Sequence, residues 1–222
     1  MLIQAIRSDV KAANLSYFPS AKPTGSIEMM GTVMPFTRNS EIYGEGESAE
    51  FIYKVITGAV RTHKVLMDGR RQIGSFYLPG DIFGLECGED HALSAEAVAN
   101  SKVLVIKRSH VDTMASRDSD VARQILRATR RELQRLQGHV LLLVMSAQER
   151  VAGFLLEMAE RSALDTEIEL PMSRQDIADY LGLTIETISR TLTSMESAAL
   201  IELPSARKVV LRDCAALRRL NR

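Results

Sequence analysis

The sequence predicts an α+β fold in which an N-terminal antiparallel β-roll, similar to a cupin or jelly roll, is followed by a long helix and a C-terminal winged helix-turn-helix unit. Three observations support this prediction: short strands between regularly spaced turn residues over 27–108, an apolar repeat of helical period over 118–148, and two short helices before an alternating segment over 173–213. We therefore divide the chain into four parts: a leader (1–26), a β-roll domain (27–115), a dimerisation helix (116–148) and a winged helix-turn-helix domain (149–222).

The composition favours a cytoplasmic protein that does not enter a membrane. The longest apolar stretch, VLLLVM at 140–145, is far shorter than the roughly 20 residues that span a bilayer, and no secretory signal pattern is present. Cys87 and Cys214 lie far apart and form no CxxC motif, which fits a reducing compartment. The 28 basic residues equal the 28 acidic residues, which argues against indiscriminate nucleic-acid binding, although 171–222 carries a local net charge of +2.

The segment 27–108 has the pattern of short strands joined by turns. Turn residues recur at intervals of roughly ten positions: Gly44-Glu45-Gly46, Gly58, Asp68-Gly69 and Pro79-Gly80-Asp81. Asp-Gly is a typical dipeptide of a tight hairpin turn, and we expect hairpins throughout 51–84. The preceding leader lacks sustained periodicity and is interrupted by two prolines, so we expect it to be ordered only in part.

The helical segment that follows carries a narrow apolar stripe. Residues at alternating spacings of three and four form an a/d seam: Leu126, Thr129, Leu133, Leu136, Val140 and Leu143. Part of the segment, HVLLLVM, is apolar nearly all round and is expected to pack against the protein itself. A strict a/d stripe is narrower than the stripe of a core-facing helix, however, so it predicts self-association as a homodimer. Gly138 either permits close approach of the partner helix or marks a bend.

Two short helices come next, with the spacing of a helix-turn-helix. Ser173 is placed to cap the first helix, with Asp176 three residues on. Gly182 supplies the backbone freedom of a tight turn. Ala178 allows the second helix to approach and Ile188 fills the angle between the two, so the segment predicts a helix-turn-helix.

The second of these helices, in LGLTIETISRTL at 181–192, has an unusual outer face. Ile185, Ile188 and Leu192 share one stripe, which we expect to be buried. The opposite side holds Glu186, Ser189, Arg190 and Thr193. An acceptor, a small hydroxyl and a guanidinium fork suit hydrogen bonding to base edges in the DNA major groove. The alternative is an ordinary surface pair between Glu186 and Arg190, worth a few tenths of a kcal/mol.

The C-terminal segment ALIELPSARKVVLRD alternates apolar and polar residues on both sides of a Pro-Ser-Ala-Arg turn, which predicts a small hairpin, or wing. Arg207, Lys208 and Arg212 cluster there, where DNA phosphates are expected. A helix-turn-helix with a wing predicts binding of double-stranded DNA. A twofold dimer would place two recognition helices about 34 Å apart on a palindromic site.

The order of these elements resembles the Crp/Fnr family of bacterial transcription regulators over roughly residues 27–215. The resemblance rests on YLPGDIFGLE at 77–86, on the heptad helix and on SRQDIADYLGLTIETISRTL at 173–192, which is similar to the Glu-x-x-Ser-Arg recognition helix of the Fnr and FixK type. It implies that Arg190 contacts guanine, Glu186 the opposing cytosine amino group and Ser189 a neighbouring thymine, in a TTGAT…ATCAA palindrome. Phosphate contacts are expected from the two helix starts and the wing: Ser173, Arg174, Thr184, Thr187, Arg207 and Lys208.

Departures from the family's sensory sites imply the FixK-like subgroup, which uses no cofactor. In the cyclic-nucleotide-binding members an arginine grips the phosphate; here Glu86 and Ser94 match that site, but Leu93 stands in place of the arginine. A cyclic phosphate would then lose its hydration without gaining a cation. The iron–sulfur members carry cysteines in the leader and one in the β-roll; the leader here has none, and Leu104 occupies the β-roll position. The four histidines are scattered and do not indicate haem.

The resemblance therefore implies a homodimeric transcription regulator, an activator, that recruits RNA polymerase through β-roll loops and the surface around 159–167. No P-loop, GxSxG or HExxH motif is present, so we expect no enzymatic activity. We also expect no metal site, because the acidic cluster at 86–90 beside His91 is more simply a solvated loop. The alternative is a ligand-controlled switch of the Crp type, whose β-roll binds a small effector before the protein binds DNA.

Overall fold

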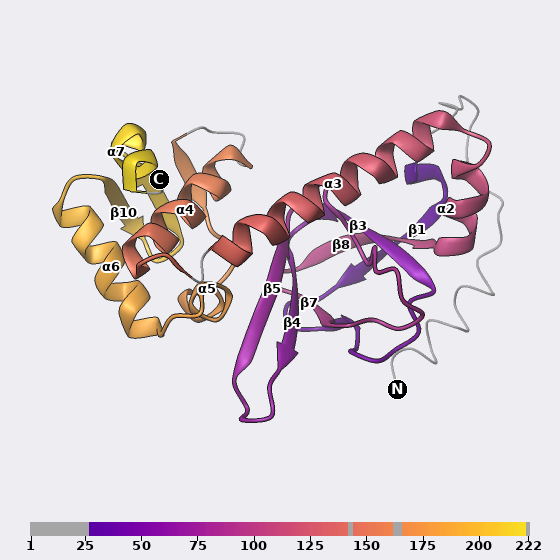
Figure 1. Cartoon of the computed structure of the whole chain (residues 1–222), viewed down its shortest axis with the longest axis horizontal. Helices are drawn as coiled ribbons and strands as arrows, with labels where there is room; N and C mark the ends of the chain where they lie inside the picture. The colour runs from indigo at the N-terminus through magenta and orange to yellow at the C-terminus, as the bar shows by residue number, and fades with distance from the viewer. Residues whose placement is uncertain (1–26, 142–143, 162–165, 221–222) are drawn as a thin grey trace.

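The computed structural model describes residues 27–141, 144–161 and 166–220, so the leader lies outside the described residues. A β-roll occupies one end of the molecule, a long helix runs along it, and a C-terminal domain of helices and short strands occupies the other end (Figure 1). The strands are β1 (Gly31–Phe36), β2 (Glu41–Tyr43), β3 (Phe51–Thr57), β4 (Val60–Val65), β5 (Arg71–Tyr77), β6 (Ile82–Phe83), β7 (Ser94–Ala97), β8 (Ser101–Lys107), β9 (Glu167–Glu169), β10 (Ile201–Ser205) and β11 (Lys208–Leu211). The helices are η1 (Ile27–Met29), α2 (Arg108–Ala115), α3 (Ser119–Leu141), α4 (Ala147–Glu160), α5 (Arg174–Leu181), α6 (Ile185–Ser197) and α7 (Cys214–Leu220). Within these ranges, no helix is long and apolar enough to cross a membrane.

Two four-stranded antiparallel sheets form the β-roll, as the sequence predicted. Their strand orders are β1-β8-β3-β6 and β2-β7-β4-β5. The hairpin β4–β5 turns at Asp68-Gly69, where Gly69 has a φ of +82°. The hairpin expected at Gly58 does not form, because β3 and β4 belong to different sheets. Gly58 has a φ of +85°, and a Cβ there would lie 2.3 Å from the Ser101 hydroxyl oxygen, so the chain crosses between the sheets at a place that only glycine fits.

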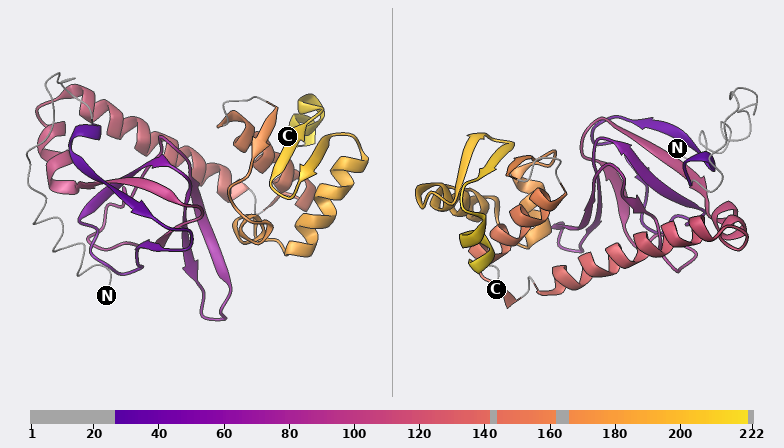
Figure 2. Two further views of the ribbon diagram at one scale, coloured as in Figure 1. Left: turned by 180° about the vertical axis from the view of Figure 1, so that it is seen from behind. Right: turned by 90° about the horizontal axis from the view of Figure 1, so that it is seen from above.

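Helix α3 follows one side of the β-roll and ends beside the C-terminal domain (Figure 2). It ends at Leu141, earlier than the sequence predicted, because Ser146 begins a second helix. The Glu149 N–H donates to the Ser146 hydroxyl at 3.3 Å, and the Ser146 N–H donates to the Glu149 carboxylate at 2.6 Å, which completes a capping box. The prediction of one continuous helix to residue 148 is therefore wrong at its C-terminal end. Leu143, the last expected seam residue, lies outside the described residues.

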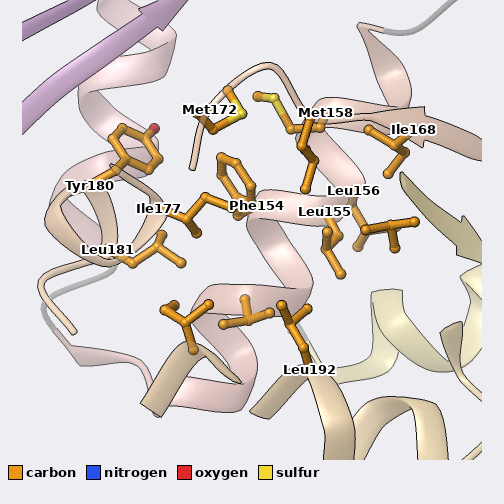
Figure 3. Close-up of a cluster of buried hydrophobic side chains, with 14 of the residues drawn as sticks. Phe154, Leu155, Leu156, Met158, Ile168, Met172, Ile177, Tyr180, Leu181 and Leu192 are labelled. Carbon is orange, nitrogen blue, oxygen red and sulfur yellow. The ribbon is translucent and has the colours of Figure 1, made fainter. Parts of the chain in front are cut away.

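Buried side chains from α4, β9, α5 and α6 converge to form the core of the C-terminal domain (Figure 3). The wing is the hairpin β10–β11, as predicted, but its turn is only the pair 206–207, because Pro204 and Ser205 belong to β10. Strand β9 pairs with β11 and completes a three-stranded sheet. Strand β9 was not predicted from the sequence, since a strand of three residues is too short to show an alternating pattern.

Candidate nucleic-acid interface

Helices α5 and α6 form a helix-turn-helix, as predicted. At the start of α5, the Asp176 N–H donates to the Ser173 hydroxyl at 3.1 Å, and the Ser173 N–H donates to the Asp176 carboxylate at 3.0 Å. Gly182 ends α5 in the left-handed region, with a φ of +63°, which favours glycine. Thr184 caps α6 by accepting a hydrogen bond from the Thr187 N–H at 3.2 Å. Each boundary is set by a short-range interaction that the local sequence encodes.

The outer face of α6 presents the three side chains expected to contact bases. Its inner face is buried through Ile188, Leu192 and Met195. Glu186 and Arg190 are consequently exposed, and Ser189 is half-buried. The backbone N–H of Glu186 and the hydroxyl of Thr184 lower the pKa of Glu186, and the charge of Arg190 adds to this effect, so Glu186 is a carboxylate at neutral pH. The structure does not show the alternative surface pair: in the described ranges, no ion pair joins Glu186 to Arg190.

Ile185 does not follow the prediction of a buried stripe. Its side chain is 37% exposed. It shares one surface hollow with Glu186, Ser189 and Arg190. Side chains on a helix lean toward its N-terminus, so the side chain of the first residue of α6 extends past the end of the core instead of into it. Helical periodicity predicted the face of α6 on which Ile185 lies, but it could not predict at which residue of the helix the buried core begins.

The residues at the helix starts that are expected to contact phosphates differ in the hydrogen bonds that their side chains already make within the protein. The hydroxyl of Ser173 donates to the Asp176 carboxylate at 2.8 Å and is thus used within the α5 capping box. Arg174 Nη1 lies 3.4 Å from the Ser189 hydroxyl oxygen, to which it donates, and this places Arg174 beside the face expected to contact bases. The hydroxyl oxygens of Thr184 and Thr187 are 3.1 Å apart at the start of α6.

On the wing, two of the three basic residues already have acidic partners. Lys208 Nζ lies 2.5 Å from Glu167 Oε1, and this contact raises the pKa of Lys208. Arg212 pairs with Glu202. Arg207 is exposed at the turn and makes no ion pair with any residue that the structure describes. Of the wing cations, Arg207 is therefore the one most available to a DNA phosphate.

The a/d seam of α3 is exposed to solvent over its described length. Its large apolar side chains expose between 48% and 63% of their surface: Leu126, Leu133, Leu136 and Val140. Thr129 is exposed as well. An exposed row of large apolar side chains along one helix typically marks a contact surface.

In the β-roll, the residues at the family's effector position contact one another or the neighbouring backbone. Glu86 Oε1 lies 3.4 Å from His91 Nδ1; burial opposes the charge of Glu86, but the contact with His91 and a backbone hydrogen bond outweigh it and lower the pKa of Glu86. The hydroxyl of Ser94 accepts a hydrogen bond from the Glu45 N–H at 2.9 Å. Leu93 packs against the backbone of β5 and offers no cation. This set does not fit a cyclic phosphate. Among the described residues, no three His, Cys, Asp or Glu side chains gather as metal ligands.

The exposed α6 face, the wing and the preceding β-roll together define a DNA-binding transcription regulator of the winged helix-turn-helix class. The family model described as a Crp-like helix-turn-helix domain matches residues 149–220. The model described as a cyclic nucleotide-binding domain matches residues 33–118.

Individual relatives specify the family further. The chain is 50% identical over 208 residues to the nitrogen fixation regulation protein FixK of Azorhizobium caulinodans, covering 91% of this chain and 84% of that protein. It is 38% identical over 218 residues to FixK of Rhizobium meliloti, covering 98% and 97% of the two chains. The solved structure of FixK2 from Bradyrhizobium japonicum superposes with a TM-score of 0.82 at 48% identity, over 87% of this chain and 98% of that chain. The chain belongs to the Crp/Fnr family of transcription regulators and is of the FixK type.

Proposed function

We propose that the protein is a homodimeric, cytoplasmic transcription activator that binds a TTGAT…ATCAA palindrome without a cofactor and recruits RNA polymerase to the promoter. The observation that carries this proposal is the outer face of α6, where Glu186, Ser189 and Arg190 surround one solvent-facing hollow. Such a face on the second helix of a helix-turn-helix enters the major groove when the domain docks on B-form DNA.

Each side chain around this hollow has a base-edge partner that suits its chemistry. The guanidinium of Arg190 donates two parallel hydrogen bonds to O6 and N7 of guanine, and the carboxylate of Glu186 accepts one from the amino group of the opposing cytosine. The hydroxyl of Ser189 bonds to a neighbouring thymine. Ile185 adds an apolar contact with a thymine methyl group, a role that its exposure supports.

The remaining contacts position the domain without reading sequence. Arg174 and Arg207 reach phosphates on the two sides of the recognition helix, because one lies beside Ser189 and the other at the tip of the wing. Thr184 and Thr187 offer hydroxyls at the α6 start. Lys208 reaches a phosphate only if it leaves Glu167, and Ser173 contributes mainly by capping α5.

Dimerisation through α3 explains how two half-sites are bound at once. The exposed seam that includes Leu133 and Leu136 is buried when two copies of α3 pair in parallel around a twofold axis. The two α6 helices then face successive turns of the major groove, about 34 Å apart.

The β-roll residues support DNA binding without a cofactor, because at the family's effector position they contact the protein itself. Above all, Leu93 stands at the position of the phosphate-binding arginine. Recruitment of RNA polymerase uses exposed β-roll loops, such as the apolar tip of the β4–β5 hairpin at 65–67. The second candidate surface, around 159–167, is described only in part, because 162–165 lie outside the described residues.

Fluorescence anisotropy of the purified protein on a labelled TTGAT…ATCAA duplex tests the proposal. We expect binding without additives, and much weaker binding to a duplex with both half-sites scrambled. Binding that requires an added cyclic nucleotide or another small effector would contradict the proposal and favour the ligand-controlled switch.

A further inference from the structure

We propose that Arg61 and Arg71 of the β-roll are positioning residues for DNA recognition. They hold α5 against the β-roll at one angle, and thereby set the half-site spacing that the dimer accepts. This inference rests on the proposed binding of a palindrome by a dimer.

The two arginines meet one carboxylate of the helix-turn-helix. Asp176 Oδ1 accepts from Arg61 Nη1 at 2.7 Å and from Arg71 Nη2 at 2.6 Å. Arg71 Nε also donates to Asp179 Oδ2 at 2.8 Å. On the β-roll side, Arg61 Nη2 donates to Glu96 Oε2 at 2.8 Å. These five side chains, from β4, β5, β7 and α5, form what we call the interdomain ion-pair network.

The network is largely withdrawn from water. The side chains of Arg61 and Asp176 are only 7% and 6% exposed. Burial opposes the charge of Asp176, but hydrogen bonds from Ser173 and the two guanidinium charges outweigh it and lower the pKa of Asp176. Buried ion pairs add little net stability, because desolvation offsets their attraction, yet their bond directions are narrow. The network is therefore better suited to defining an orientation than to holding the domains together.

Asp176 connects this orientation to the DNA-contacting helices. Its second oxygen, Oδ2, accepts from the N–H and the hydroxyl of Ser173, so the same carboxylate caps α5 and receives the β-roll arginines. Helix α6 packs on α5 through the fully buried Ala178 and Ile188. Because α6 is packed on α5, the orientation of α6 changes when that of α5 changes.

The rest of the interdomain contact combines aromatic packing with one further ionic contact at the end of α4, where Arg161 pairs with Asp81 and donates to the Phe76 carbonyl at 3.0 Å. The ring of Phe76 in β5 lies 5.3 Å from that of Tyr180 and 6.3 Å from that of Phe154, measured between centroids. Apolar burial is non-directional. Without the contacts of Arg61 and Arg71, α5 could tilt about the Arg161 contact while the domains keep most of their buried apolar area.

Glu186 and Arg190 stay exposed while all five ionic side chains are engaged, so the network leaves the proposed base-contacting face of α6 uncovered. Around a twofold axis, any tilt of α5 displaces both recognition helices. Each base pair advances about 3.4 Å along the duplex, so a displacement of a few ångströms changes the preferred spacing by one base pair.

The test compares Arg71→Met with Arg70→Met in the full-length protein. Arg71→Met removes the guanidinium and keeps an apolar stem. Arg70 is the adjacent residue of the same hairpin and pairs with Asp68 in its own turn, so Arg70→Met is a matched control. Affinity is measured on a single half-site, on a palindrome with the spacer preferred by the wild type, and on palindromes with spacers one and two base pairs longer or shorter.

We expect Arg71→Met to bind the single half-site as the wild type does, to bind the preferred palindrome about tenfold more weakly, and to lose most of the discrimination between spacers, because preorganisation is lost while base contacts are kept. Arg70→Met should match the wild type on every duplex. If Arg71→Met fails to fold, Asp179→Asn removes part of the same contact from the helix side and should show the same pattern more weakly.

Unchanged spacer discrimination in both Arg71→Met and Asp179→Asn overturns the proposal. A parallel loss on the half-site and the palindrome also overturns it, since that pattern reports damage to the helix-turn-helix itself. A wild-type protein with no spacer preference would instead contradict the proposed function, before any variant is compared.

Discussion

Replacing Leu133 and Leu136 together by alanine should weaken the dimer about a hundredfold. The two side chains are 55% and 50% exposed in the single chain. Full burial of a leucine side chain contributes about 1.5–3 kcal/mol, so covering the exposed half contributes about 1 kcal/mol each. Four such side chains meet in a dimer, which gives about 4 kcal/mol. Alanine keeps the β-carbon, so we expect a loss of about 3 kcal/mol, or roughly a hundredfold in the dimer Kd.

Sedimentation equilibrium over a range of protein concentrations measures this Kd directly. The control is Met67→Ala, which truncates a fully exposed apolar side chain on the β4–β5 hairpin and should leave the dimer Kd unchanged. The double variant should also bind the full palindrome more weakly at concentrations where it is monomeric. If it sediments as a dimer with the wild-type Kd, α3 does not pair through this seam and the reasoning fails.

Three further predictions concern the DNA-contacting domain and the long helix. Arg190→Ala should cost about 1–3 kcal/mol of binding free energy and relax the sequence preference at one base pair. Arg207→Ala should instead weaken binding to all sequences equally and reduce the salt dependence of binding by about one phosphate contact. Titrations on mutated duplexes at several salt concentrations distinguish the two variants. Gly182→Ala should lower the free energy of unfolding by about 1–2 kcal/mol, because Gly182 has a positive φ, while Gly138→Ala should raise it by about 1 kcal/mol; urea unfolding measures both changes. If sedimentation shows a weaker dimer in Gly138→Ala, the partner helix needs the glycine for close approach. The folded-state pKa of Asp176 is lowered, so this carboxylate contributes stability that is present above its unfolded pKa of about 4 and is lost as the pH falls through the folded value. Asp176→Asn should therefore lose less stability than the wild type between neutral and acid pH. Equal acid sensitivity of the two proteins would argue against this.

Features with local causes could be predicted from the sequence. The capping box of Ser173 and Asp176, the left-handed turn at Gly182 and the hairpin at Asp68-Gly69 each depend on residues a few positions apart. The face of α6 that carries Glu186 and Arg190 followed from helical periodicity alone. Such features do not depend on how the rest of the chain packs.

Features decided by tertiary packing could not be predicted. The crossing at Gly58 depends on which sheet the next strand joins, and the exposure of Ile185 depends on where the core ends. The contacts of Asp176 with Arg61 and Arg71 span 115 and 105 residues, and no pattern in a single sequence links such distant positions. These long-range contacts join α5 to the β-roll.

Selection of bound duplexes from a random pool, with the wild type and with Arg190→Ala and without any added effector, tests most directly whether the outer face of α6 reads DNA bases. We predict that the wild type enriches a palindrome with TTGAT-type half-sites, and that Arg190→Ala loses the preference for the guanine in each half-site while keeping the rest of the motif. Enrichment of no palindrome by the wild type, or of an identical motif by both proteins, would contradict the assignment of α6 as the base-contacting helix.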